Sequence, residues 1–242
     1  MTARSDPDEM AIVTSRSTDA YTAAPAGSAR ATIAVLHAWW GVTDVVTGVC
    51  DDLAALGYVA VAPDLYAGEL ASTAEEAAVL RARKRTTPMW RQIVAAVDEA
   101  RSTHGADAVG QIGFSMGGHW ALWLAKQSQP EIPPISATTV FYATRGGDFS
   151  ASQSAFQFHL ADTDPFVSPS SIKRQQRQLT AADLDAEFHD YPGTGHWFFE
   201  WDRPDAHDAA AADLSWKRTI EFLDRNLPRA GAPGSSKPDI TR

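Results

Sequence analysis

The segment Gly113–Gly117 (GFSMG) has the spacing of a tight turn that presents a serine as a nucleophile. Glycines are needed on both sides because the serine backbone is strained, and larger neighbours would clash with it. A β-rich run (AVGQIGF) leads into this segment, and a helical run (MGGHWALWLAK) leaves it. Backbone N–H groups at the start of a helix can stabilise negative charge next to the serine. The pattern therefore indicates nucleophilic catalysis by Ser115.

A serine nucleophile needs a histidine as its base and a carboxylate to orient that histidine. Asp164 lies in LADTDPFVSP, just after the β-rich run FQFHL, and His196 lies in DYPGTGHWFF, just after LDAEFHDYP. Both follow the C-terminal ends of expected strands, where doubly wound sheets place their sites. We therefore predict a triad of Ser115, Asp164 and His196, with Asp162 as the competing acid.

The run ATIAVLHAWWG ends in polar and aromatic residues at the end of another expected strand. This loop can supply one backbone N–H to an oxyanion hole, and the residue after the nucleophile supplies the other. We predict that Trp39 (with Trp40 as the alternative) and Met116 are these donors, although both indoles could instead pack under the loops. Side chains near these loops suggest an aromatic substrate pocket: Trp40, His37, Tyr66, Trp197 and Phe198, with Tyr142 as a further candidate.

The remaining histidines and the basic residues have simpler interpretations. His104, His119, His159, His189 and His207 fit no catalytic loop, which favours structural or solvated roles. A basic run could grip an anion, but a solvated helix face is the preferred interpretation; it comprises Arg81, Arg83, Lys84 and Arg85. A metal site using His37, His196 and nearby acids lacks a recognisable ligand spacing. We expect neither a metal nor a cofactor.

Short β-rich runs alternate with helical stretches along most of the chain, which predicts an α/β fold with a mostly parallel, doubly wound sheet and helices on both faces. The first two runs have no helix between them and should form an antiparallel hairpin at one edge. Helices are expected over 44–56, 87–104, 116–128, 169–181 and about 206–226. A further helix should begin at a capping box formed by Ser72 and Glu75. The expected organisation is a flexible N-terminus (1–10), one domain (11–228) and a disordered tail (229–242).

The 242-residue chain has 21 basic and 30 acidic residues, and its formal net charge of −9 argues against nucleic acid or an anionic membrane as a partner. Its one cysteine, Cys50, excludes an intramolecular disulfide and favours a buried core position. No apolar run reaches the length of a membrane span, and the N-terminus lacks the pattern of a signal peptide. We expect a cytoplasmic protein, monomeric or homodimeric, that acts on a small molecule.

From about residue 12 to 227 the sequence resembles the dienelactone hydrolase family, whose members have the α/β-hydrolase fold. The resemblance rests on HAWWGVTD, GYVAVAPDLYAG, IGFSMGG, and DTDPFV together with GTGHWFF. It implies a cofactor-free intracellular hydrolase of lactones or esters, with Ser115 as nucleophile, Asp164 as acid and His196 as base.

The sequence departs from the founding members of that family at four positions. Those members have a cysteine at the position of Ser115 and a glutamate at that of Ala38, and two arginines that hold the substrate carboxylate at the positions of Gly68 and Glu200. Without these arginines we expect an anionic dienelactone to be a poor substrate. The alternatives are a thioesterase or acyltransferase using the same triad, and a non-catalytic binding protein on this scaffold.

Overall fold

The computed structural model describes residues 11–17, 19–83 and 86–227. Eight strands of this part of the chain form one sheet, in the order β1-β2-β4-β3-β5-β6-β7-β8. The strands are β1 (Ile12–Arg16), β2 (Ala20–Pro25), β3 (Thr32–Leu36), β4 (Val59–Pro63), β5 (Val109–Phe114), β6 (Ile135–Phe141), β7 (Ala155–Thr163) and β8 (Ala186–Gly195). The helices are α1 (Asp44–Ala55), α2 (Ala74–Arg83), α3 (Thr86–His104), α4 (Met116–Ala125), α5 (Pro169–Ala181) and α6 (Ala209–Asn226).

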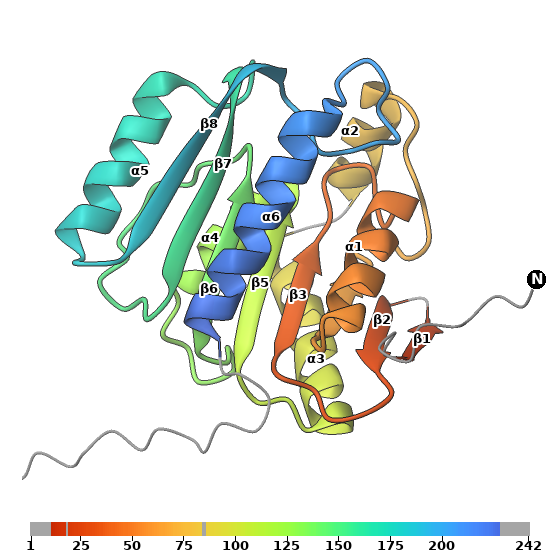
Figure 1. Ribbon diagram of the computed structural model, residues 1–242. Helices are drawn as coiled ribbons and strands as arrows, with labels where there is room; N and C mark the ends of the chain where they lie inside the picture. Colours follow the sequence, from red (N-terminus) through yellow and green to blue (C-terminus); the bar gives the residue numbers. More distant parts are fainter. Residues whose placement is uncertain (1–10, 18, 84–85, 228–242) are drawn as a thin grey trace, which may run out of the picture.

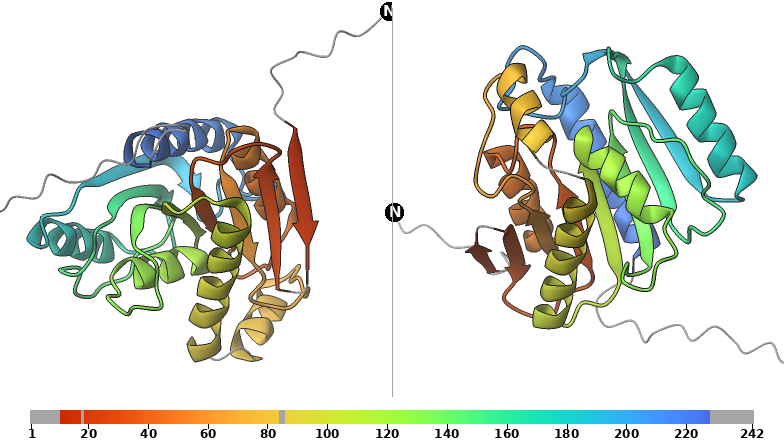
Figure 2. Two further views of the ribbon diagram at one scale, coloured as in Figure 1. Left: turned by 90° about the horizontal axis from the view of Figure 1, so that it is seen from below. Right: turned by 180° about the vertical axis from the view of Figure 1, so that it is seen from behind.

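The strands from β3 to β8 run parallel to one another, whereas β2 pairs antiparallel with β4 and forms an antiparallel hairpin with β1 at that edge. Helices α1 and α6 cover one face of the sheet, while α3 and α4 cover the other (Figures 1 and 2). Every residue of β3, β4 and β5 is buried, as expected for central parallel strands with helices on both faces. The predicted fold class and the edge hairpin are therefore confirmed, and Cys50 lies in the core.

The capping box of α2 lies one residue later than predicted. The Glu76 N–H donates to Thr73 Oγ1 (3.2 Å), and the carboxylate of Glu76 accepts from the Thr73 N–H (3.3 Å) and the Ser72 N–H (2.8 Å). The cap is therefore Thr73 with Glu76, rather than Ser72 with Glu75. The reason is that the N-cap directly precedes the first helical residue, which here is Ala74.

The predicted flexible N-terminus (1–10) and disordered tail (229–242) lie outside the residues that the structure describes. Within those residues, no helix is long and apolar enough to cross a membrane.

Candidate active site

The turn between β5 and α4 holds Ser115 in a strained conformation. Its backbone has φ +49° and ψ −106°, which is unusual for a residue with a side chain. The Ser115 N–H donates to the Phe141 carbonyl of the neighbouring strand (3.1 Å). A Cβ atom at position 117 would lie 1.9 Å from the carbonyl oxygen of Leu36, and one at position 113 would lie 2.5 Å from the Gly117 carbonyl oxygen. Gly117 is therefore required for α4 to start this close to β3, and Gly113 for it to start this close to β5.

Ser115, His196 and Asp164 form a continuous hydrogen-bonded chain. Ser115 Oγ lies 2.8 Å from His196 Nε2, and His196 Nδ1 lies 2.7 Å from Asp164 Oδ2. The side chains of His196 and Asp164 are each 3% exposed. The three residues come from the ends of β5, β7 and β8, which lie at the same edge of the sheet. The structure thus brings together the residues that the sequence singled out.

The acid loop after β7 also distinguishes Asp164 from its competitor. Asp164 Oδ1 accepts the backbone N–H groups of Phe166 (2.8 Å) and Val167 (3.1 Å), which fixes the carboxylate while Oδ2 faces His196. Asp162 instead accepts the Gly193 N–H (3.0 Å). The geometry therefore favours Asp164 as the partner of the histidine.

The two candidate oxyanion donors lie on either side of the nucleophile. Met116 is the first residue of α4, so its N–H has no intrahelical acceptor. Trp39 lies in the loop after β3, and no backbone carbonyl among the described residues accepts its N–H. The side chains of Trp39 and Met116 both line the cavity next to Ser115. This arrangement is compatible with the predicted donor roles.

A cavity of about 680 Å³ opens over Ser115, within the usual size range of small-molecule sites. Its lining combines four aromatic side chains, two methionines, two arginines and a histidine, and contains no carboxylate from the described residues. The lining residues are Trp39, Arg81, Ala82, Met89, Ser115, Met116, His119, Trp120, Arg145, Phe166 and Trp197.

Of the five side chains predicted to form the pocket, only Trp197 lines this cavity. His37 is fully buried and braces the loop, since Nε2 accepts the Leu65 N–H (3.2 Å) and Nδ1 lies 2.5 Å from the Ala38 carbonyl oxygen. The Tyr66 hydroxyl donates to Met116 Sδ (3.4 Å) from behind the lining. Trp40 and Phe198 are buried in the core. These four predictions are corrected because the aromatic residues form two layers, and only the outer layer faces the cavity.

The outer aromatic layer includes Phe166, which the sequence reasoning did not single out. Its ring packs against His196 (4.8 Å between centroids), Trp39 (5.9 Å) and Trp197 (5.7 Å), yet 57% of its surface stays exposed. Phe166 therefore lies at the cavity mouth. The available signal was its place in the acid loop, two residues after Asp164.

Two arginines at the cavity were also missed. Arg81, on α2, was assigned with its neighbours to a solvated face; Arg81 and Arg83 are both exposed, but Arg83 pairs with Glu69 (3.0 Å) whereas Arg81 also lines the cavity. Arg145 follows β6, and its Nη1 donates to the His119 carbonyl at 3.4 Å. Neither Arg81 nor Arg145 forms an ion pair within the part of the chain that the structure describes. The cavity is therefore cationic.

Gly68 and Glu200, the two positions at which the founding family members have substrate-binding arginines, both lie outside this lining. Gly68 has a positive φ of +89° and open space around it. Glu200 is 3% exposed, and the hydroxyl of Tyr142 donates to its Oε1 (2.7 Å). The acid at position 200 therefore does not face the substrate cavity.

Among the described residues, no cluster of three or more His, Cys, Asp or Glu side chains could hold a metal ion. The site is built from the serine, histidine and aspartate, two candidate backbone donors, and a cavity with aromatic and cationic walls. Such an arrangement can activate a hydroxyl for attack on an acyl carbon.

The chain is similar in sequence and in fold to several known proteins. A protein of Aquifex aeolicus named "Putative carboxymethylenebutenolidase" is 29% identical over 220 residues, which cover 86% of this chain and 93% of that protein. A Bradyrhizobium protein named "Probable 2-oxo-3-(5-oxofuran-2-ylidene)propanoate lactonase" is 28% identical over 227 residues, covering 86% and 89%. The crystal structure of a dienelactone hydrolase-like promiscuous phosphotriesterase from metagenomic libraries covers 90% of this chain and 99% of its own, with a TM-score of 0.76 at 19% identity.

The last of these similarities confirms the α/β-hydrolase fold. The profile of the dienelactone hydrolase family matches residues 18–227, which is most of the chain. The protein therefore belongs to the dienelactone hydrolase family.

Proposed function

We propose that this protein hydrolyses carboxylic esters or lactones through an acyl-enzyme formed on Ser115. The observation that carries the proposal is the continuous chain from Ser115 Oγ through His196 to the buried carboxylate of Asp164, with distances of 2.8 and 2.7 Å. The relatives named as a carboxymethylenebutenolidase and a lactonase support this class of reaction.

In the first step, Ser115 Oγ attacks the acyl carbon while His196 Nε2 takes the hydroxyl proton. Asp164 keeps the other nitrogen of the ring protonated and stabilises the imidazolium that forms. The N–H groups of Trp39 and Met116 stabilise the oxyanion, and one such donor contributes about 3 kcal/mol in a related setting. His196 returns its proton to the leaving alkoxide and then activates a water molecule, which releases the acid and restores the serine.

The charge of the cavity supports a finer proposal about the substrate. Two guanidinium groups line this cavity, and the described residues supply neither an ion-pair partner for them nor a carboxylate to the lining, in a protein with a formal net charge of −9. Arginine forks suit carboxylate and phosphate groups. We therefore propose that good substrates bear an anionic group that reaches Arg81 and Arg145. This reverses our expectation from Gly68 and Glu200, because cationic side chains from α2 and the loop after β6 face the site instead.

Labelling with a fluorophosphonate, followed by peptide mass spectrometry, tests the nucleophile directly. We expect one adduct on Ser115 and loss of p-nitrophenyl ester hydrolysis in Ser115→Ala. An adduct on another residue, or unchanged hydrolysis in that variant, would contradict the mechanism.

The same triad could serve a thioesterase or an acyltransferase, since the fold does not select the substrate. A panel of lactones, aryl esters and acyl thioesters, each with and without an alcohol acceptor, separates these reactions. A non-catalytic binding protein on this scaffold would show no Ser115-dependent turnover of any of them.

A further inference from the structure

Glu200 is a buried carboxylic acid only four residues after His196, and the proposed mechanism does not use it. Its side chain accepts a hydrogen bond from the Tyr142 hydroxyl (2.7 Å). The pKa of Glu200 is raised to about 8, chiefly by burial and also by Asp202, although the hydrogen bond from Tyr142 and the charge of Arg203 lower it. At neutral pH the side chain is therefore mainly an uncharged carboxylic acid.

Tyr142 connects this acid to the catalytic turn. It directly follows β6 and has φ +40°, a left-handed conformation that costs about 1–3 kcal/mol for a residue with a bulky side chain. Its N–H donates to the His159 carbonyl (2.7 Å), and the preceding carbonyl, of Phe141, accepts the Ser115 N–H. The position of Tyr142 is therefore linked through one peptide unit to the position of the nucleophile.

The ring of Tyr142 packs directly against the imidazole of His196. Their centroids are 4.8 Å apart with an interplanar angle of 56°, and Tyr142 is 1% exposed. The two hydrogen bonds of His196 are made by its two ring nitrogens. They therefore only weakly resist rotation of the imidazole about the line that joins Nδ1 and Nε2. A ring contact from the side supplies the missing restraint.

We propose that Tyr142 and Glu200 form a positioning pair for His196: the acid holds the phenol, and the phenol ring holds the imidazole toward Ser115. Neither residue lines the substrate cavity, so the pair acts through the contact of Tyr142 with the histidine. This proposal rests on the proposed function, because it assigns the histidine its catalytic orientation.

An uncharged acid suits this role for an electrostatic reason. Ionised Glu200 would place a further negative charge beside Tyr142, which already lies near Asp202 and Asp164. The groups that face the pair are Asp202 and Arg203 around Glu200, and Asp202 and Asp164 around Tyr142. A neutral carboxyl anchors the phenol without adding to this charge.

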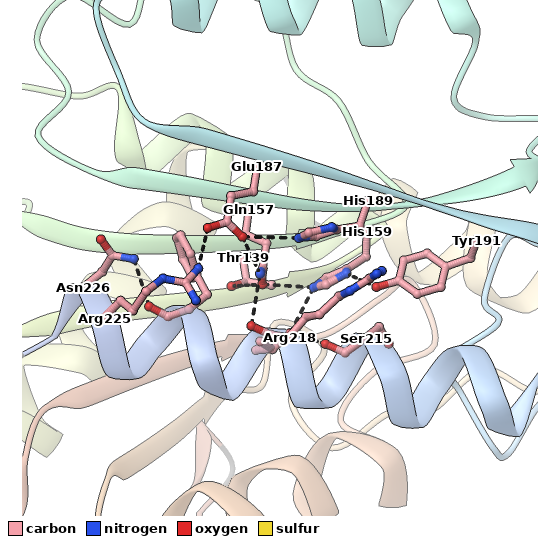
Figure 3. Close-up of polar contacts among 12 residues, drawn as sticks. Thr139, Gln157, His159, Glu187, His189, Tyr191, Ser215, Arg218, Arg225 and Asn226 are labelled. Atoms are coloured by element: carbon pink, nitrogen blue, oxygen red, sulfur yellow. Dashed lines mark hydrogen bonds and ion pairs between the residues drawn. The ribbon is translucent and has the colours of Figure 1, made fainter.

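The test compares four variants: Tyr142→Phe, Glu200→Leu, Glu200→Gln and the control Tyr191→Phe. Tyr191, like Tyr142, is a buried tyrosine whose hydroxyl forms a hydrogen bond with a buried titratable side chain. Its partner is His159 Nδ1, at 2.7 Å, and the pair lies between the sheet and α6 (Figure 3). Each variant is measured for kcat, KM, thermal melting and the downfield proton NMR signal of the His196 Nδ1–H.

We expect Tyr142→Phe and Glu200→Leu to lower kcat about tenfold to 100-fold with little change in KM, since misplacement of a catalytic group acts on this scale. Both should shift or broaden the Nδ1–H signal. Glutamine keeps the shape and the acceptor, so Glu200→Gln should recover most of the kcat lost in Glu200→Leu. Tyr191→Phe should lower the melting temperature without this kinetic and spectroscopic signature.

The proposal is wrong if Tyr142→Phe behaves like Tyr191→Phe, with lower stability but unchanged kcat and an unchanged Nδ1–H signal. It is also wrong if leucine and glutamine at position 200 give the same kcat. The NMR signal does not depend on turnover, so it tests the pair even if Ser115-dependent hydrolysis is absent and the proposed function fails.

Discussion

Asp164 Oδ2 lies 2.7 Å from His196 Nδ1, and each of the two side chains is only 3% exposed to solvent. A buried carboxylate at this distance fixes the tautomer in which Nε2 is free to accept the serine proton. Asp164→Asn should therefore lower kcat by roughly 10⁴-fold, the loss seen when an amide replaces such an acid.

The matched control is Asp162→Asn, which alters the neighbouring acid whose carboxylate binds the Gly193 N–H rather than the histidine. Its activity should stay within a few-fold of the wild type. Steady-state kinetics on a neutral aryl ester compare the two variants, and equal losses would mean that Asp164 has no special role.

The approach of α4 to β3 makes a prediction about stability. A Cβ atom at position 117 would lie 1.9 Å from the Leu36 carbonyl oxygen, and backbone atoms cannot move away as a flexible side chain can. Gly117→Ala should therefore cost more than the roughly 1–3 kcal/mol typical of overpacking. Gly27→Ala serves as the control, since nothing lies within 4 Å of its added Cβ. Urea unfolding measures both, and equal midpoints would contradict the steric argument.

The sequence was sufficient to predict the sheet, the edge hairpin and the positions of Ser115, Asp164 and His196, because these depend on local patterns and chain order. A glycine-flanked serine between a strand and a helix is a short-range signal. An acid and a histidine after later strands need only the rule that parallel strands end at one edge. Their meeting at hydrogen-bond distance follows from the sheet order.

The cavity walls could not be predicted in the same way, because they depend on which face of a loop or helix each side chain takes. Trp39 and Trp40 are adjacent in sequence, yet Trp39 lines the cavity and Trp40 is 4% exposed in the core. Arg81 and Arg83 lie on one helix, yet only Arg81 faces the cavity, while Arg83 pairs with Glu69. These choices are decided by packing between elements distant in sequence.

Two buried histidines predict a loss of stability in mild acid. His37 and His159 are fully buried, and burial lowers the pKa of each below its usual 6.5. The folded state then binds fewer protons than the unfolded state, so the stabilisation is complete above pH 6.5 and is lost as the pH falls through and below that value. Glu200→Gln lacks the opposing titration of Glu200, so the free energy of unfolding of this variant, measured by urea, should decrease from pH 8 to pH 5. A value independent of pH in this range would contradict the prediction.

Glu200 predicts the opposite trend. Burial raises its pKa from 4.5 to about 8, so its contribution to stability is complete below pH 4.5 and is lost as the pH rises toward 8. Glu200→Gln removes this titration while keeping the acceptor for Tyr142. The melting temperature of the variant minus that of the wild type should increase as the pH rises from 5 to 8.5. A constant difference between the two proteins across this range would show that Glu200 does not titrate there.

The cationic cavity predicts a preference for anionic esters that depends on Arg81 and Arg145. The kcat/KM for mono-p-nitrophenyl succinate, divided by that for p-nitrophenyl butyrate, measures the preference on one leaving group. A hydrogen bond to a charged group contributes about 1.5–3 kcal/mol. The ratio should therefore fall at least about tenfold in the double variant Arg81→Gln/Arg145→Gln. Arg83→Gln removes a charge from the same helix outside the cavity and should leave the ratio unchanged. Equal ratios in the wild type and the double variant would show that these arginines do not bind the substrate.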